Sequence, residues 1–408
     1  MAKSLYISVV GQINGKNEAA LAVLAKAPKS SAAYFKPIAL GPDDPGVKAA
    51  LAAAGLPGAP ADYYGLTQKE AFDLLAQGQT SAIMDTVFQK YNPLASRYAT
   101  VVIEGVDLQP SGGALPNLDA DLAANLGSPV ILLAETKAEG AAAAAALAVR
   151  TYQGRFAEVL GLAVIGGGGK PVLPEGVNLC EFAAPAGVAA CPCLEKAGEL
   201  AGRPGRPVTP KRFEFQLIEK AKLKKQHIVL PEGNDERILR AADDILAKDF
   251  AAITILGDPD AISRKAKELG LGTLTAKAQL LNPQNSPLLP DLTHEFFELR
   301  KAKGITEEKA AAQMKDRNFF GTMMIQRKKA DGMVSGADGT TADTIRPALM
   351  IIKTKPGCSI ASSVFLMCLA DRVWVFGDCA INPNPTPQQL AEIAIISAQT
   401  AKAFGVEP

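Results

Sequence analysis

The segment 331–349 combines small residues, hydroxyl groups and an arginine in an order that suits anion binding. A predicted strand ends at Ser335, and the small residues that begin at Gly336 let a ligand approach the backbone closely. Thr340 or Thr341 can cap a following helix, whose first N–H groups then face the ligand. We therefore expect an anion-binding loop at the end of this strand.

Arg346 lies directly before Pro347 in the same segment. Because proline lacks an N–H and clashes with the preceding turn, we expect a helix that begins at Thr341 to kink or restart near Arg346. A guanidinium at that point can bind phosphate through two parallel hydrogen bonds. The alternative is a glycine turn followed by a surface arginine that pairs with Asp343.

Polar side chains follow two other predicted strands. The strand 227–230 leads into a cluster of acids that begins at Glu232, and a role in the first turn of a helix explains these acids adequately. The strand 373–376 leads into Asp378 and Asn382. Since ligands of open α/β sheets bind beyond the carboxyl ends of strands, Asp378 and Asn382 are candidate binding residues. A turn-forming Asp and Asn are the alternative.

Residues 11–17 follow a predicted strand and precede a predicted helix, which is the position of a phosphate-binding P-loop. Only three residues separate the two glycines where the motif has four, and Asn17 stands where a Ser or Thr would bind magnesium. We therefore expect a P-loop-like unit that does not hydrolyse nucleoside triphosphates. Glu104 and Asp107, which follow a later strand, are either metal-binding acids or ordinary loop acids.

Short apolar runs separated by helix-length segments recur along the chain, a pattern typical of parallel strands that are buried on both faces. The expected strands are 5–10, 100–103, 129–133, 160–165, 227–230, 253–256, 333–335, 360–366 and 373–376. In the second half, the expected helices are 235–248, 259–269, 292–303, 307–327 and 387–404. The chain is predicted to contain an α/β domain over 1–172, a Pro/Gly-rich linker over 173–210 and a second α/β domain over 211–408.

The charge and hydropathy of the chain exclude several classes of protein. The 43 Lys and Arg nearly cancel the 42 Asp and Glu, so nucleic acid is not an expected partner. The apolar tract 141–149 is too short to cross a bilayer, and residues 1–10 lack the features of a signal peptide, which indicates a cytoplasmic chain. Cys191 and Cys193 are separated by one residue rather than two, so we expect no metal site.

Residues 212 to 406 resemble the phosphate acetyltransferase family almost continuously. The matching strings are IVLPEGNDERIL, ELRKAKGIT, FFGTMM, ADGMVSGADGTTADTIRPAL, IIKTKPGCS, SSVFLM and VFGDCAINPNPTPQQLAEIAI. Residues 1–172 are similar to the P-loop-type domain of the longer family members, which has the dethiobiotin synthetase fold. The resemblance implies an N-terminal P-loop-like parallel-sheet domain followed by an incomplete phosphate acetyl/butyryl transferase α/β domain.

The family's reaction is the reversible transfer of acetyl between acetyl-CoA and phosphate, giving acetyl phosphate and CoA. The resemblance therefore implies an acyltransferase of acetate metabolism that uses CoA as a substrate, needs no cofactor or metal, and forms a homo-oligomer. By position, Arg300 and Arg346 match arginines that bind the anionic groups of the substrates. The residues that line the same cleft are Ser335, Gly336, Thr340 and Thr341.

The chain departs from the family pattern in two places. Asp338 and Gly339 stand where an apolar residue followed by His or Asn is common, which puts a carboxylate beside the proposed anion site. The family's catalytic aspartate belongs to a segment that would follow residue 408, so the catalytic residue is unknown here. One alternative is therefore a truncated or regulatory chain of the same family that has no activity. A further alternative is an enzyme that transfers a longer acyl group such as butyryl.

Overall fold

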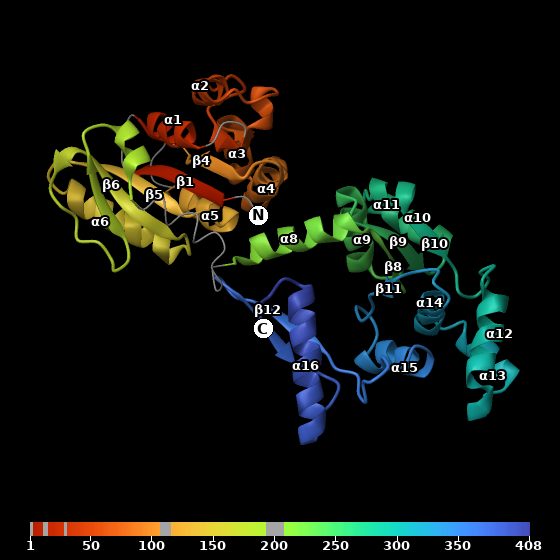
Figure 1. The fold of residues 1–408 in the computed structure, drawn as a ribbon. Coiled ribbons are helices and arrows are strands. Elements are labelled where there is room, and N and C mark those ends of the chain that lie inside the picture. Colours follow the sequence, from red (N-terminus) through yellow and green to blue (C-terminus); the bar gives the residue numbers. More distant parts are fainter. Residues whose placement is uncertain (1–2, 11–14, 28–30, 107–115, 193–207) are drawn as a thin grey trace. The chain divides into compact units, whose positions relative to one another are not determined.

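The computed structural model describes residues 3–10, 15–27, 31–106, 116–192 and 208–408 (Figure 1). The chain divides into two compact units. The first consists of Met1–Phe215, Phe365–Phe376 and Ala401–Pro408, and the second of Gln216–Val364 and Gly377–Thr400. Within the described ranges, no helix is long and apolar enough to cross a membrane.

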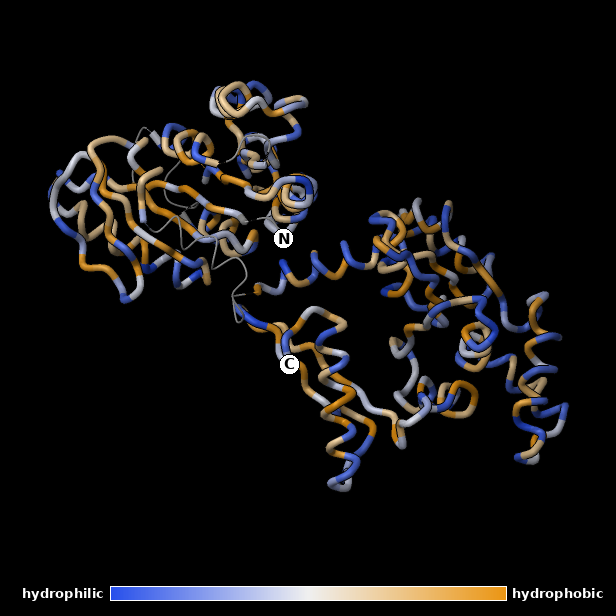
Figure 2. Tube along the Cα trace, viewed as in Figure 1, coloured by the Kyte–Doolittle hydropathy of each residue, from blue (hydrophilic) through white to orange (hydrophobic). Residues whose placement is uncertain are grey.

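The first unit is built on a seven-stranded parallel sheet with the order β3-β2-β4-β1-β5-β6-β7. Its strands are β1 (Lys3–Val10), β2 (Ala32–Ala39), β3 (Tyr64–Thr67), β4 (Thr100–Glu104), β5 (Val130–Thr136), β6 (Val159–Gly168) and β7 (Asn178–Phe182). Consecutive residues of the central strands are fully buried, for example Val101, Val102 and Ile103, which shows that both faces of the sheet are covered. The predicted parallel α/β fold is confirmed, and Figure 2 shows the hydrophobic colour along these strands.

Helices connect the parallel strands of this unit. They are α1 (Lys16–Lys26), α2 (Pro45–Ala54), α3 (Gln68–Ala76), α4 (Thr80–Arg97), α5 (Pro116–Leu126) and α6 (Ala141–Gly154), with the 3₁₀ turns η1 (Pro60–Asp62) and η2 (Pro185–Ala190). Strand β7 lies inside the segment 173–210 that we expect to be a linker, yet it pairs with β6. The N-terminal sheet therefore extends past residue 172.

The second unit contains a smaller parallel sheet with the order β10-β9-β8-β11. Its strands are β8 (Gln226–Leu230), β9 (Ala251–Leu256), β10 (Gln279–Leu281) and β11 (Gly332–Met333). The connecting helices are α9 (Glu236–Lys248), α10 (Pro259–Glu268), α11 (Gly272–Lys277), α12 (Leu289–Arg300), α13 (Glu307–Gln313), α14 (Arg317–Gln326) and α15 (Thr341–Ile351), with the turn η3 (Lys301–Lys303) after α12. Helix α8 (Pro210–Leu223) begins in the first unit and ends in the second.

Two helices of the second unit differ from expectation. The predicted helix 307–327 is divided, because Asp316 accepts hydrogen bonds from the N–H groups of Asn318 and Phe319 and so starts α14 anew. Helix α15 continues through Pro347, so the predicted restart near Arg346 is wrong. Pro347 is buried, and its burial offsets the one backbone hydrogen bond that a proline removes.

The chain continues into the strands β12 (Val364–Cys368) and β13 (Val373–Gly377) and the helix α16 (Pro387–Ala403). The sequence predicts a capping box at Thr386 and Gln389 before α16. The reciprocal hydrogen bonds between these two residues confirm it.

Candidate active site

The glycine-containing loop that follows β11 directs its backbone N–H groups onto Glu232, at the end of β8. The amides of Gly336 and Ala337 donate to Oε2 at 3.0 and 2.9 Å, and the next two amides, at 338 and 339, donate to Oε1 at 2.8 and 3.1 Å. Burial alone would raise the pKa of Glu232, but these four amides outweigh it and hold the pKa below its usual range. Our expectation that the loop leaves its backbone open to a ligand is therefore wrong, since these amides are already bonded.

Asp338 is paired by side chains on both sides of the loop. Its Oδ2 atom accepts from Nη2 of Arg317 at 3.0 Å and from Nδ2 of Asn234 at 3.1 Å, and the arginine also donates to Oδ1 of Asn234 at 2.8 Å. Arg237 donates to the carbonyl of Ala337 at 2.6 Å. The carboxylate that departs from the family pattern is therefore balanced by a guanidinium, which reduces its repulsion of an anion.

The remaining loop residues lead into the first turn of α15. Ser335 donates to Oδ1 of Asn318 at 3.0 Å. Thr340 caps the helix and forms a capping box with Asp343. Of the two caps that the sequence predicts, Thr340 and Thr341, the structure uses Thr340. By helix geometry, the N–H groups of Thr341 and the residue after it have no partner inside the helix. The anion-binding groups that the structure leaves accessible are thus at the start of α15 rather than in the loop.

Arg346 is exposed on α15, four residues after Ala342 and therefore on the same helix face. Side chains on a helix tilt toward its N-terminus, so the guanidinium leans toward the first turn. Arg300 is partly buried at the end of α12, and both α12 and α15 pack against α14. Within the described chain, neither guanidinium donates a hydrogen bond to a protein group. The hydrogen bonds from Thr340 and the nearby charge of Arg346 lower the pKa of Asp343, so the pairing of Arg346 with Asp343 that the sequence leaves open is a weak, longer-range one.

Asp378 and Asn382 form a closed turn after β13. The Asp378 Oδ1 atom accepts from Oγ of Ser363 at 2.7 Å and from the amides of Ala380 and Ile381, while Oδ2 accepts from the amide of Asn382 at 2.9 Å. Burial alone would raise the pKa of Asp378, but these hydrogen bonds outweigh it and lower the pKa. Both residues are therefore occupied in holding the turn, which is the alternative left open by the sequence.

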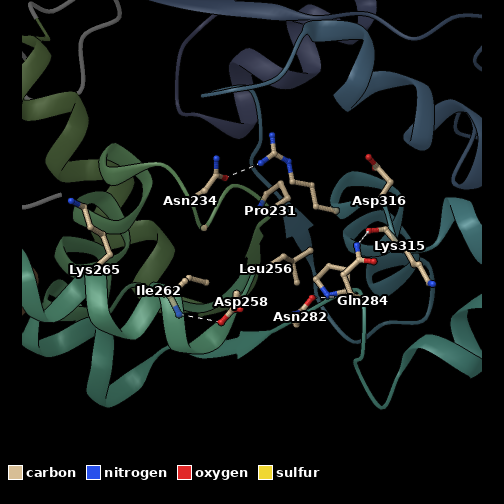
Figure 3. Close-up of a pocket in the computed structure, with 15 residues that line it drawn as sticks. Pro231, Asn234, Leu256, Asp258, Ile262, Lys265, Asn282, Gln284, Lys315 and Asp316 are labelled. Atoms are coloured by element: carbon tan, nitrogen blue, oxygen red, sulfur yellow. Dashed lines mark hydrogen bonds between the residues drawn. The ribbon is translucent and has the colours of Figure 1, made fainter.

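A pocket of about 680 Å³ opens at the carboxyl ends of β8, β9 and β10 (Figure 3). Leu256 and Pro231 lie centrally in Figure 3, and Lys265 and Lys315 lie at opposite sides. The remaining lining residues are Gly233, Asn234, Gly257, Asp258, Ala261, Ile262, Asn282, Pro283, Gln284, Asp316 and Arg317. The pocket shares Asn234 and Arg317 with the loop site, so the two are adjacent. The pocket is not predictable from the sequence, because its lining comes from four separate segments.

The N-terminal unit has a buried polar network at the place expected for a P-loop. Lys16 donates to the carbonyl of Gly105 at 2.6 Å, and Asn17 donates to Oε2 of Glu104 at 2.7 Å. Lys36 lies 3.0 Å from Oε1 of Glu104 and 3.2 Å from Oδ2 of Asp44. Glu104 is thus a buried ion-pair partner rather than an ordinary loop acid. The second predicted acid, at 107, and the first glycine, at 11, lie outside the described residues.

We expect the chain not to hydrolyse ATP, because the side chains of Lys16 and Asn17 are engaged inside the fold rather than available to phosphate or magnesium. The measurement is phosphate release from ATP by the purified chain, with the variant Lys16→Ala as control. Release above the buffer blank that disappears in this variant would contradict the prediction.

Comparison with known proteins places these observations in a family. Residues 212–408 match the family model described as phosphate acetyl/butaryl transferase, and residues 3–190 match a model described as an AAA domain. A phosphate acetyltransferase of Nitratidesulfovibrio vulgaris is 54% identical over 214 residues, which are 52% of this chain and 30% of that protein. A phosphate acetyltransferase of Helicobacter pylori is 36% identical over 352 residues, which are 84% of this chain and 64% of that protein.

A solved phosphotransacetylase from Streptococcus pyogenes is 42% identical, with a TM-score of 0.47, over 49% of this chain and 61% of its own. The fold and the site define a two-part α/β protein with a structured loop at the carboxyl edge of its second parallel sheet. Residues 212–408 match the phosphate acetyltransferase family over their whole length, as the resemblance of the sequence predicts. It spans 30% and 64% of the lengths of the two curated relatives.

Proposed function

We propose that the protein represented by this chain is a phosphate acetyltransferase, which exchanges acetyl between CoA and phosphate. The observation that carries the proposal is the loop 335–341, which resembles the family's substrate loop and ends at the first turn of α15 with Arg346 exposed beside it. Relatives named phosphate acetyltransferase support the same reaction. CoA is a substrate in this reaction, so the proposal requires no cofactor and no metal.

In the proposed reaction the CoA thiol loses its proton and the thiolate attacks the carbonyl carbon of acetyl phosphate. The new C–S bond forms, the bond between the carbonyl carbon and the bridging oxygen breaks, and inorganic phosphate leaves with that oxygen. Arg346 and the N–H groups at the start of α15 bind the phosphate, which acquires charge as it leaves. Arg300 holds a second anionic group of the substrates. The resemblance assigns the base to a segment C-terminal to residue 408.

The alternative of an inactive or regulatory chain is distinguished by an assay of thioester formation from CoA and acetyl phosphate. The same assay with butyryl phosphate tests the acyl preference. A cytoplasmic location and homo-oligomer formation remain part of the proposal. Cell fractionation and light scattering test these two properties in turn.

Replacement of Arg346 by alanine should weaken the binding of acetyl phosphate by about 1.5–3 kcal/mol, the range for a hydrogen bond to a charged group. Isothermal calorimetry of the chain and of Arg346→Ala measures the difference. The matched control is Arg264→Ala, which removes an exposed arginine from α10 and should leave the affinity unchanged. Equal affinities of wild type and Arg346→Ala for both CoA and acetyl phosphate would assign Arg346 to the solvated surface.

A further inference from the structure

The carboxylate of Glu232 is fully buried, although a lone buried carboxylate is strongly unfavourable. It is stabilised by four consecutive N–H groups of the loop after β11, at 2.8 to 3.1 Å. Successive amides that converge in this way form a concavity that binds anions. In this protein the anion in the concavity is a side chain of the protein itself.

Strands β8 and β11 are neighbours in the sheet, so Glu232 and the loop meet at the carboxyl ends of adjacent strands. This is also the point where the strand order changes direction, since β9 and β10 lie on the other side of β8. Ligands of open α/β sheets bind at such a point. Glu232 therefore determines the shape of the backbone where a ligand is expected.

The backbone of the loop 336–339 is held mainly by its hydrogen bonds to Glu232. Gly336 has a φ of 117°, which a side chain rarely permits. Arg237 holds the carbonyl of Ala337, and Arg317 holds the side chain of Asp338. These two contacts are exposed, whereas the contacts of Glu232 are not.

We propose that Glu232 is a positioning residue whose buried carboxylate occupies the amides 336–339, presets the start of α15 and directs the anionic substrate to Thr341, Ala342 and Arg346. The proposal rests on the proposed function for the identity of the substrate, acetyl phosphate or the phosphate groups of CoA. The holding of the loop does not depend on that function. In a protein without this carboxylate, the four amides would be free to bind an external anion.

The first experiment measures hydrogen–deuterium exchange of the amides 336–339 in the full chain. In Glu232→Ala the exchange should be about tenfold faster or more, because four hydrogen bonds to a charged group are lost. Formate, a carboxylate small enough to enter the vacated space, should restore slow exchange. Exchange as slow in Glu232→Ala as in wild type would overturn the proposal, and so would faster exchange that formate leaves unchanged.

The second experiment measures acetyl phosphate binding by calorimetry. The affinity of Glu232→Ala should fall about tenfold or more and should recover with formate, which a general loss of stability would not produce. Glu236→Gln is the matched control, because Glu236 is exposed on the same segment and pairs with Arg240 and Lys265 on helix surfaces. If Glu232→Ala does not fold, Glu232→Gln replaces it, since a neutral side chain of the same size places an NH₂ against two of the amides.

The outcomes separate the inference from the proposed function. If wild type binds neither acetyl phosphate nor CoA while the exchange result holds, the loop is positioned by Glu232 but the proposed substrate is wrong, and the substrate part of the inference falls with it. If wild type binds and the Glu232 variants bind equally well, the inference is wrong and the proposed function stands.

Discussion

Residues 1–408 by themselves should transfer acetyl from acetyl phosphate to CoA about 10² to 10⁴ times more slowly than the same chain joined to the C-terminal segment of a family member. The reason is that a positioned general base contributes about this factor. The resemblance places the family's base in that segment. Binding by Arg346 and the start of α15 supplies only the orientation and charge stabilisation of the substrate.

The assay follows thioester formation by ultraviolet absorbance for the two proteins at equal concentration. The segment from the Nitratidesulfovibrio vulgaris relative is suitable, since that protein is 54% identical to this chain over the shared region. Comparable turnover would show that a base lies among residues 1–408. Asp378→Asn and Asp338→Asn would then be tested first, although each of these carboxylates is bonded to neighbouring groups in the structure.

Replacement of Lys36 by methionine should destabilise the N-terminal unit by about 3–5 kcal/mol, the range for breaking a buried ion pair from one side. Lys36 is 2% exposed and lies between Glu104 and Asp44, each of which is 1% exposed. Methionine fills a similar space without a charge, so both carboxylates lose their cation. Calorimetric unfolding of the chain measures the loss as a lower transition temperature of this unit.

The control for Lys36→Met is Lys69→Met, which removes an exposed lysine whose pairing with Asp73 at 3.6 Å should contribute little. The double variant Lys36→Met with Glu104→Gln should cost less than Lys36→Met alone, because one of the two orphaned charges is gone. Equal stability of wild type and Lys36→Met would contradict the prediction and would mean that the carboxylates accept protons or water without loss.

The stability that this ion-pair network contributes should also depend on pH. Burial alone would raise the pKa of Asp44, but the amides of Leu40 and Val47 and the cation of Lys36 outweigh it and lower the pKa. A carboxyl group with a lowered pKa stabilises the fold above the pKa of the unfolded chain and loses that contribution as the pH falls through the folded value. The difference between wild type and Lys36→Met should therefore shrink below the ordinary carboxyl range.

The sequence by itself determined the class of fold, because the signals for it are local. Runs of Val, Ile and Leu predict buried parallel strands over a few residues, and the structure confirms β1, β4, β5, β6, β8 and β9 close to the expected positions. Strands β2, β3, β7 and β10 are not predicted. Strand β2 carries Lys36 and Pro37 among its apolar residues, β3 and β10 have only four and three residues, and β7 lies in the segment expected to be a linker. The caps at Thr340 and Thr386 were predictable, since a cap depends only on residues within one turn.

Only the tertiary structure decided which groups of the site are free and which are engaged. Glu232 resembles an ordinary first-turn acid in the sequence, and its partners lie 104 to 107 positions further along the chain. Nothing in the sequence indicates that Asp338 is paired, and only the fold brings Arg317 and Asn234 beside it. The physical reason is that a buried carboxylate is stabilised by whatever donors the neighbouring strand brings to it, and strand order arises from the packing of the whole sheet rather than from any short run of residues.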